Sequence, residues 1–361
     1  MKPSSTTGNS PRSNPAPKNV PEYDIDSVYK KKLNSGLLPG EIILIDWISG
    51  KTSEAQFPRY FETTYGINAK HSLGKLIDEG YVAEGTLIES LNSFKIPQLK
   101  EALKTKELKV SGKKADLISR IKDHFTEGEI ESFVDYNVYK VTTKGEEVLN
   151  QYYYIVPAHR KDTKDGIYNV ANAIRHVKKF DYNKSNADIS WGLFQEASLE
   201  YAKKQKYGLM RNVNLHKARQ LKREERFNNA LFQYLRVFIS ETSGMWNGNR
   251  VSLPKHMLLE SFQTEQIRVL METLEMDEKD LRELFEYTWD RTRGELPYHY
   301  LTFEECSRCL LLSMEENEKE IEVLFYDAYK RLNEKYDDDS FYEEFGVHIP
   351  YDHQEILGLN M

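Results

Sequence analysis

Hydrophobic residues recur at helical spacing in the segment that follows residue 38, and the pattern predicts a helix beginning near Pro39–Gly40. Its apolar side is formed by Ile42, Ile43, Ile45 and Trp47–Ile48. A second short helix fits FPRYFETTYG (57–66), where Gly66 ends it. Asn68 can cap a third helix within AKHSLGKLIDEGYV (69–82). Three short helices joined by tight turns predict the skeleton of a helix-turn-helix.

Two segments, one at the end of this skeleton and one further along the chain, carry a second pattern. LIDEGYV (76–82) resembles the end of the recognition helix and the first wing strand of winged-helix regulators. NVYKVTTKGEEVL (137–149) resembles the second wing strand and the next helix, a pattern often written Y-x-L-T-x-x-G. Tyr139, Thr142 and Gly145 match it, with Val141 at the usual leucine position. The resemblance implies a winged-helix-like domain with an insertion at its wing tip, where insertions are tolerated. The alternative is two unrelated helical pieces in series.

The second half of the chain shows periodic helical segments without clear strands. QYYYIVPAHR (151–160) predicts a strand or a helix end, and the polar stretch RKDTKDG (160–166) predicts a domain boundary. ERFNNALFQYLRVFI (225–239) resembles the second half of a tetratricopeptide-type helical pair, although no clean 34-residue repeat occurs. We therefore expect a mainly α fold with three parts: a disordered tail (1–22), the winged-helix-like domain (23–160) and an α-helical acidic domain (161–361).

Composition narrows the class of protein. The chain has 361 residues, of which 30% are charged and 39% hydrophobic, and this suggests two or three domains. No run approaches the roughly 18–20 apolar residues that span a bilayer, so we expect no membrane association. Residues 1–22 are rich in Ser, Pro and Asn and lack the apolar core of a signal peptide, which favours a cytoplasmic location.

Two cysteines, Cys306 and Cys309, form a C-x-x-C pair in LTFEECSRCLLLSMEENEKE (301–320). A zinc site needs two further ligands, and no second C-x-x-C or H-x-x-x-H occurs. The segment reads as one amphipathic helix, on which both cysteines share a face and one or both pack in the core. We expect no metal and no cofactor, and the scarcity of cysteine is typical of a reducing compartment.

Charge is distributed unevenly along the chain. The net charge is -7, which is unusual for a protein that binds a polyanion. Residues 91–125 nevertheless hold nine Lys and Arg against four acids, whereas residues 271–361 hold nine against 25. Only the local charge bears on phosphate binding, so residues 91–125 are the candidate contact region.

The segment SFKIPQLKEALKTKELKVSGKKADLISRIKDHF (93–125) resembles the SAP domain nearly end to end. Its matching positions are Leu99, Lys100 and Leu103 in the first helix, Leu108 in the loop, Ser111, Gly112 and Lys114 in the turn, and Leu117, Ile118, Arg120 and Ile121 in the second helix. The resemblance covers about a tenth of the chain. It implies a helix, an extended loop and a second helix, and a protein that binds chromosomal or A/T-rich DNA.

The residues of this segment support phosphate binding by themselves. Pro97 suits the start of the first helix, and Gly112 permits a close turn. A phosphate can be received at the positive N-terminus of the second helix, and Lys104, Lys106 and Lys109 could extend the track along the loop. The candidate DNA-binding residues are Lys100, Lys104, Lys109, Ser111, Gly112, Lys113, Lys114 and Arg120. The alternative is a solvated helical hairpin with a lysine-rich face.

Two other groups of basic residues lie outside residues 91–125, and for each the alternative is ordinary solvent exposure. The third helix should expose Lys70, His71 and Lys75, which form a possible second DNA surface. A further basic run over residues 203–226 includes several glutamates and is more typical of a solvated helix with salt bridges. 

Signatures of enzymes are missing from the sequence. No phosphate-binding loop, dinucleotide-binding turn or nucleophile elbow occurs, and the nine histidines have no metal-ligand spacing. We therefore expect a DNA-binding protein without catalytic activity, regulatory or architectural on a chromosome or mobile element, because it resembles SAP-domain proteins of Gram-positive bacteria and their phages. Its acidic C-terminal helices would bind a protein partner or self-associate. The alternatives are a helical scaffold anchored near DNA and an unrecognised nuclease or processing subunit.

Overall fold

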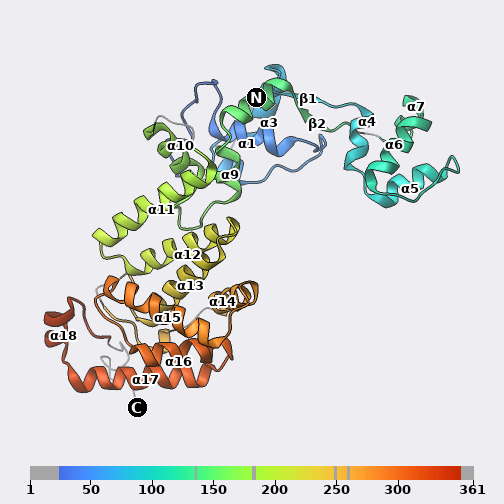
Figure 1. Ribbon diagram of the computed structural model, residues 1–361. Coiled ribbons are helices and arrows are strands. Elements are labelled where there is room, and N and C mark those ends of the chain that lie inside the picture. Colours follow the sequence, from blue (N-terminus) through green and yellow to red (C-terminus); the bar gives the residue numbers. More distant parts are fainter. Residues whose placement is uncertain (1–23, 135, 181–183, 248–249, 258–260, 351–361) are drawn as a thin grey trace, which may run out of the picture. The chain divides into compact units, whose positions relative to one another are not determined.

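The computed structural model describes residues 24–134, 136–180, 184–247, 250–257 and 261–350 (Figure 1). These residues form 18 α-helices and one two-stranded sheet, so the expected mainly α fold is confirmed. The chain divides into two compact units, Met1–Val156 (unit 1) and Pro157–Met361 (unit 2). The expected disordered tail, residues 1–22, lies outside the described residues. None of the described helices combines the length and apolar character that crossing a membrane requires.

Unit 1 begins with the three short helices that the hydrophobic pattern predicts. They are α1 (Pro39–Ile48), α2 (Tyr60–Thr63) and α3 (Ala69–Asp78). In α1 every residue from Ile42 to Ile45 is buried, so this helix is the centre of the core rather than a one-sided surface helix. The Asn68 side chain accepts a 3.0 Å hydrogen bond from the N–H of His71, which confirms the predicted cap of α3.

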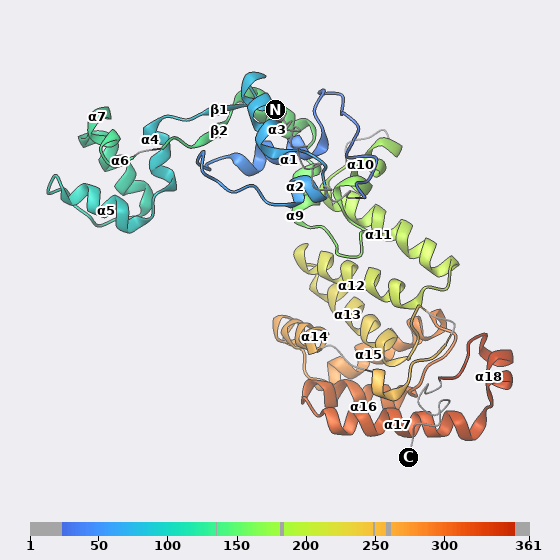
Figure 2. The same cartoon turned by 180° about the vertical axis from the view of Figure 1, so that it is seen from behind.

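Two short strands join the helices of unit 1 to an insert. Strand β1 (Val82–Glu84) pairs antiparallel with β2 (Tyr139–Val141), and α8 (Thr143–Gln151) follows β2 (Figures 1 and 2). Gly145, in the first turn of α8, lies against Tyr81, the residue before β1, because a Cβ at Gly145 would stand 2.3 Å from the backbone oxygen of Tyr81. This close approach explains the glycine of the Y-x-L-T-x-x-G pattern.

Residues 85–138, here called the insert, lie between the two strands and form helices of their own. These are α4 (Leu87–Ser90), the 3-10 helix η1 (Leu91–Ser93), α5 (Ile96–Lys104), α6 (Lys114–His124) and α7 (Glu127–Glu131). They enclose a hydrophobic cluster whose members all come from the insert, from Leu87 to Tyr136. The insert therefore has a core of its own.

Helices account for nearly all of unit 2. They are α10 (Val170–Lys179), α11 (Asn186–Lys203), α12 (Tyr207–Arg223), α13 (Phe227–Thr242), η2 (Pro254–His256), α14 (Ser261–Thr273), α15 (Glu278–Thr292), η3 (Arg293–Glu295), α16 (Phe303–Met314), α17 (Glu318–Lys335) and α18 (Asp338–Phe345). The helix α9 (Ile155–Arg160) spans the division between the units, so QYYYIVPAHR ends in a helix and contains no strand.

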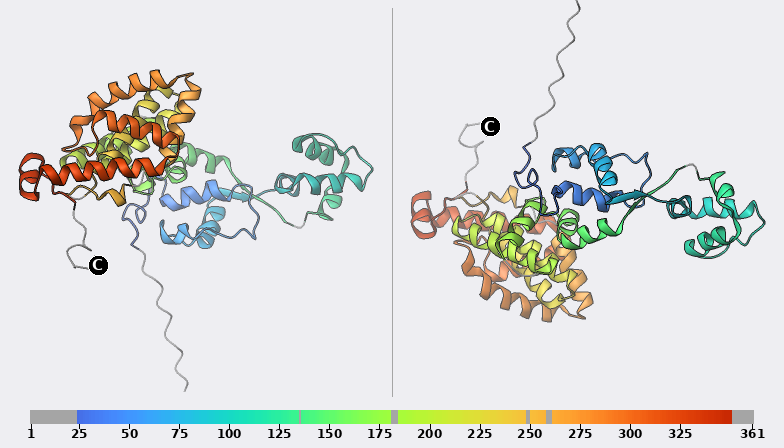
Figure 3. Two further views of the ribbon diagram at one scale, coloured as in Figure 1. Left: turned by 90° about the horizontal axis from the view of Figure 1, so that it is seen from below. Right: turned by 90° about the horizontal axis from the view of Figure 1, so that it is seen from above.

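Helices that follow one another in unit 2 pack side by side, as α11, α12, α13 and α14 do in turn. The long helix α17, red in Figure 3, packs alongside α16. One hydrophobic core runs through the unit from Leu215 to Val347 and includes Phe238, Phe285 and Phe325. The arrangement is an array of helix pairs without the 34-residue repeat that a tetratricopeptide array would show.

Two segments that look continuous in sequence are broken in the structure. LTFEECSRCLLLSMEENEKE was expected to be one helix, but α16 ends at Met314 and α17 begins at Glu318. The periodic stretch 209–244 likewise divides into α12 and α13. Glu316 and Glu225 stand at these two turns in the left-handed region, with φ of 59° and 58°. Because neither residue is glycine, the usual sequence signal for a helix end is missing.

Candidate nucleic-acid interface

The two helices of the SAP-like segment, α5 and α6, pack against each other through aliphatic side chains. The buried ones are Leu99, Leu103, Leu117, Ile118 and Ile121, as the motif predicts. Pro97 lies in the first turn of α5, where its missing N–H costs little. Beyond the motif, Phe94, Ile130 and Val134 complete the cluster. The small pair of helices is therefore supported by the segments before and after it.

The loop between the helices is held by a glycine and an arginine. Gly112 has a φ of +129°, a conformation that favours glycine, and a Cβ there would stand 3.0 Å from Oδ2 of Asp116. Arg120 donates from Nη1 to the backbone oxygens of Lys109 (2.5 Å) and Ser111 (3.3 Å). Arg120 is one of the predicted DNA contacts, and in the structure its guanidinium faces the carbonyl groups of the loop and supports them.

The N-terminus of α6, where a phosphate was expected, already carries a side-chain cap. The N–H of Lys113 donates to Oδ2 of Asp116 at 2.8 Å, and the N–H groups of Asp116 and Leu117 donate to the backbone oxygen of Lys113. The N–H groups of Lys114 and Ala115 remain in the first turn, where an α-helix offers no acceptor of its own. A phosphate at this end would therefore meet two N–H groups and the charge of Asp116.

Two lysines that were expected along the phosphate track are engaged within the insert. Lys114 donates from Nζ to the backbone oxygen of Asn92 at 2.7 Å. Lys106 donates to the backbone oxygen of His124 at 2.8 Å and to Glu129 at 2.7 Å. The Lys106 ammonium, with the N–H and hydroxyl of Thr126, lowers the pKa of Glu129 to about 2. Lys106 therefore ties the turn after α5 to the end of α6 and to α7.

The ammonium groups of the other lysines in residues 91–125 make no hydrogen bond or ion pair with any residue that the structure describes. These lysines are Lys95, Lys100, Lys104, Lys109, Lys113 and Lys122. All are exposed except Lys100, which is half-buried, and Ser111 and Gly112 are exposed between them. Lys100 and Lys104 are one helical turn apart on α5, so they share a face. The unengaged cations thus come from α5, from the loop and from both ends of α6.

The possible second surface on α3 is smaller than expected. Lys70 and His71 are exposed, as predicted. Lys75 is half-buried, because its ammonium lies 3.0 Å from the carboxylate of Glu41, which is only 3% exposed. Glu41 also accepts a 2.8 Å hydrogen bond from the N–H of Leu38 and so caps α1. The exposure predicted for Lys75 is wrong, since this lysine joins α3 to α1.

The basic run of residues 203–226 is engaged with neighbouring side chains, as predicted for a salt-bridged face. Lys204 pairs with Glu200 at 2.6 Å, and Arg211 pairs with the buried Glu241 at 2.6 Å. Lys217 donates to the hydroxyl of Ser198, and burial lowers the pKa of Lys217 to about 8. Arg211 and Lys217 join α12 to α13 and α11, whereas the pair of Lys204 and Glu200 lies within the end of α11.

The cysteine pair packs in the core, which confirms that prediction. Cys306 and Cys309 are both fully buried in α16, and Sγ of Cys306 lies 3.1 Å from the hydroxyl of Thr242. Burial raises the pKa of Cys309 to about 12.

His348 lies 2.9 Å from Asp338, whereas Asp352 and His353 lie outside the described residues. In the part of the chain that the structure describes, no three His, Cys, Asp or Glu residues are placed to hold a metal ion.

The comparison with protein families agrees with the geometry of the insert. The family model described as SAP domain matches residues 90–126. The SAP domain is a DNA-binding motif, and its presence supports a general DNA-binding role for this chain. No curated protein and no solved structure matches the chain. We refer to residues 90–126 as the SAP unit.

Proposed function

We propose that the protein binds double-stranded DNA through its phosphate backbone, using the unengaged lysines of the SAP unit. The observation that carries this proposal is a difference between the lysine side chains. Some ammonium groups are hydrogen-bonded within the insert, while those of Lys100, Lys104, Lys109 and Lys113 have no partner among the described residues. Phosphate contacts by such groups set affinity and orientation without reading bases. Any sequence preference would therefore come from groove width, as in A/T-rich DNA.

The N-terminal part of unit 1 supports a second contact in the same proposal. The order α1, α2, α3, β1, insert, β2, α8 is the order expected for a winged-helix-like domain that carries an insertion at its wing. On its other side, β2 forms hydrogen bonds with residues 50 and 51, which extend the strand pair. In such a domain α3 would enter the major groove, with Lys70 and His71 towards the DNA.

We assign the protein a regulatory or architectural role on a chromosome or mobile element, without catalytic activity. Titratable groups with shifted pKa values, such as Cys309 and Lys217, lie in the packed core or between helices and serve the fold. A helical scaffold held near DNA is the second candidate. It is favoured by large apolar side chains that unit 2 exposes, such as Leu199 (64% exposed) and Val323 (58%).

The proposal is tested by titrating DNA with the full chain at several salt concentrations. In a variant with Lys100, Lys104, Lys109 and Lys113 changed to Gln, we expect weaker binding. We also expect the slope of log affinity against log salt to fall by about 0.9 for each lysine that contacts a phosphate. Magnesium-dependent cutting of the same DNA by the wild-type protein would contradict the absence of catalysis.

A matched control removes charge from unit 2. Lys178 and Lys319 are exposed and have no ion pair among the described residues, so Lys178→Gln/Lys319→Gln changes net charge without touching the insert. We expect affinity and salt slope to stay at wild-type values. If the control and the SAP variant lose the same DNA affinity for each charge removed, the whole surface of the protein contributes to binding. The assignment to the SAP unit is then wrong.

A further inference from the structure

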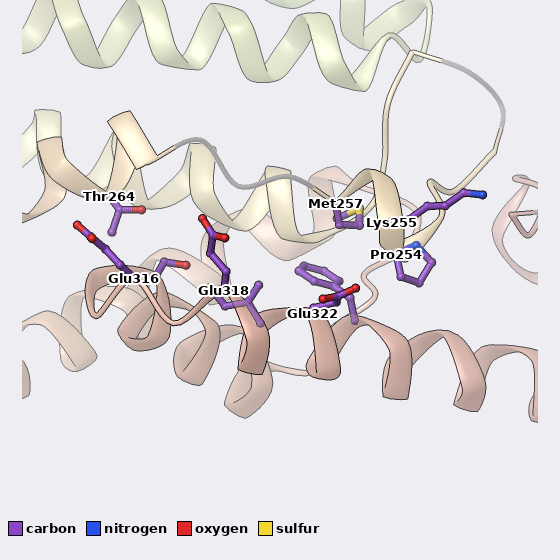
Figure 4. A pocket seen from close by; sticks show the side chains of 10 residues that line it. Pro254, Lys255, Met257, Thr264, Glu316, Glu318 and Glu322 are labelled. Atoms are coloured by element: carbon purple, nitrogen blue, oxygen red, sulfur yellow. The ribbon is translucent and has the colours of Figure 1, made fainter.

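A hollow of about 510 Å³ lies in unit 2 between α14, η2 and the first turns of α17 (Figure 4). Its floor is apolar and is formed by Pro254, Met257, Ile321 and Phe325, all of which are buried. Its volume falls within the roughly 300–1,000 Å³ of ligand-binding pockets. The hollow lies outside the SAP unit, and DNA binding gives it no role.

The rim of the hollow carries three carboxylates. Glu316, Glu318 and Glu322 line it, are exposed, and make no ion pair with any described residue. The neighbouring Glu320 on α17, by contrast, pairs with Arg308 at 2.7 Å. Lys255 is the one cation in the lining, and it already has contacts of its own. The hollow therefore attracts cations and repels the phosphates of nucleic acid.

The side chain of Thr264 adds a hydroxyl group to the lining of the hollow. Thr264 on α14 lines the hollow and is only 4% exposed, and its side chain faces the space between α14 and α17 in Figure 4. Thr264 and Ser313 are the hydroxyl-bearing residues among those that line the hollow.

The chemistry of the hollow selects the ligand. Carboxylates spread along a rim suit a cation on an apolar stem, which is the form of a lysine or arginine side chain. They do not suit a metal ion, because no three acidic side chains among the described residues are gathered closely enough. The apolar floor is wide enough to take a hydrophobic residue beside the cation. A peptide supplies both groups together.

We propose that this hollow binds a segment of a partner protein in which Arg or Lys stands next to Leu or Phe. The cationic group would lie between Glu318 and Glu322, and the apolar side chain would cover Ile321 and Phe325. The inference is independent of DNA binding, because it rests on unit 2 alone.

The test uses the full-length protein and a library of labelled nonapeptides in which Arg or Lys and Leu or Phe occupy permuted positions. Binding is followed by fluorescence anisotropy. We expect the best members to lose at least tenfold in affinity when Glu318→Gln and Glu322→Gln are combined.

The control variant, Glu286→Gln/Glu343→Gln, removes two exposed carboxylates that line no part of the hollow and have no ion pair among the described residues. It should bind the best peptides within twofold of wild type. The proposal is overturned if no library member binds more tightly than its counterpart with Glu at the basic positions. It is equally overturned if both double variants lose the same affinity, since the attraction would then come from net charge.

Discussion

At the scale of single residues, the same side-chain type serves two purposes in the SAP unit. Lys106 and Lys114 hold backbone carbonyls of the insert, whereas Lys104 and Lys113 have no partner among the described residues. The motif and the local charge do not distinguish these two kinds of lysine. Which lysine reaches a carbonyl depends on where α7 and the segment before α5 lie. Tertiary contacts therefore decide which cations remain available to phosphate.

Arg120 provides the clearest test at this scale. We expect Arg120→Lys to keep the charge but to lose one of the two hydrogen bonds to the loop, because a guanidinium can span both carbonyls in a fixed fork. Losing one such bond costs about 1 kcal/mol. The loop around Gly112 should then exchange its amide hydrogens faster, and DNA affinity should fall because the loop lysines are less well placed.

Lys122→Gln is the matched control for this prediction, since Lys122 lies two residues further along α6 and is exposed. It removes a charge without touching the loop, so amide exchange in residues 109–113 should stay as in the wild type. If Arg120→Lys weakens DNA binding while exchange in the loop is unchanged, Arg120 contacts the DNA directly and does not act through the loop.

At the scale of elements, unit 2 uses one kind of turn repeatedly. Gln205, Glu225, Glu275 and Glu316 follow α11, α12, α14 and α16 and have φ between 54° and 59°. After each, the next N–H donates to the backbone oxygen five residues earlier, as in Met276 to Met271 at 2.9 Å. This is the Schellman closure of a helix end, made here without glycine.

These turns predict that glycine stabilises the fold at one glutamate and destabilises it at another. The left-handed conformation is about 1–2 kcal/mol less favourable for a residue with a Cβ than for glycine. Part of this gain is offset because glycine loses more conformational entropy when the chain folds. We therefore expect Glu275→Gly to raise the free energy of unfolding by about 0.5–1 kcal/mol. Glu272→Gly, three residues earlier within α14, should lower it by about 1 kcal/mol. Thermal or urea unfolding measures both, and equal signs would contradict the turn geometry.

The sequence predicts helix starts in this protein better than helix ends. Helix starts carry side-chain signals in the sequence. The cap residue Asn68 before α3 is one of them, and it predicts this helix start correctly. The ends of α12 and α16 carry glutamates in a conformation that usually selects glycine, and residues 301–320 were therefore expected to form a single helix. In the SAP unit the aliphatic core was predictable from spacing. The pairing of Lys75 with Glu41 was not, because it joins positions 34 residues apart.

At the scale of the whole molecule, the insert is attached to unit 1 by a strand pair that could close without it. The N–H of Gly85 donates to the backbone oxygen of Val138 at 2.7 Å, so the two ends of the insert are already neighbours. The cluster inside the insert draws on residues 87–136 alone. The core around α1 therefore depends little on it, as expected for an insertion at a loop tip.

The last prediction removes the insert from the full chain. Residues 86–137 are replaced by Asn-Gly, which forms the tight turn that antiparallel strands prefer. The N–H of Val138, which donates to Ser90 at 3.1 Å, then has the backbone oxygen of Gly85 as its acceptor. We expect the shortened protein to fold, with circular dichroism that shows the loss of the insert's helices only.

The DNA affinity of this shortened protein separates the two proposed contacts. If the SAP unit supplies most of the binding, affinity falls by tenfold or more, a loss of about 1.4 kcal/mol or above. The remaining affinity should then decrease further in Lys70→Gln/His71→Gln, because α3 would be the surface left. A shortened protein that binds DNA as tightly as the wild type would place the interface on unit 1 outside the insert or on unit 2. Because excision keeps both units intact, that outcome would separate a wrong interface from a misfolded protein.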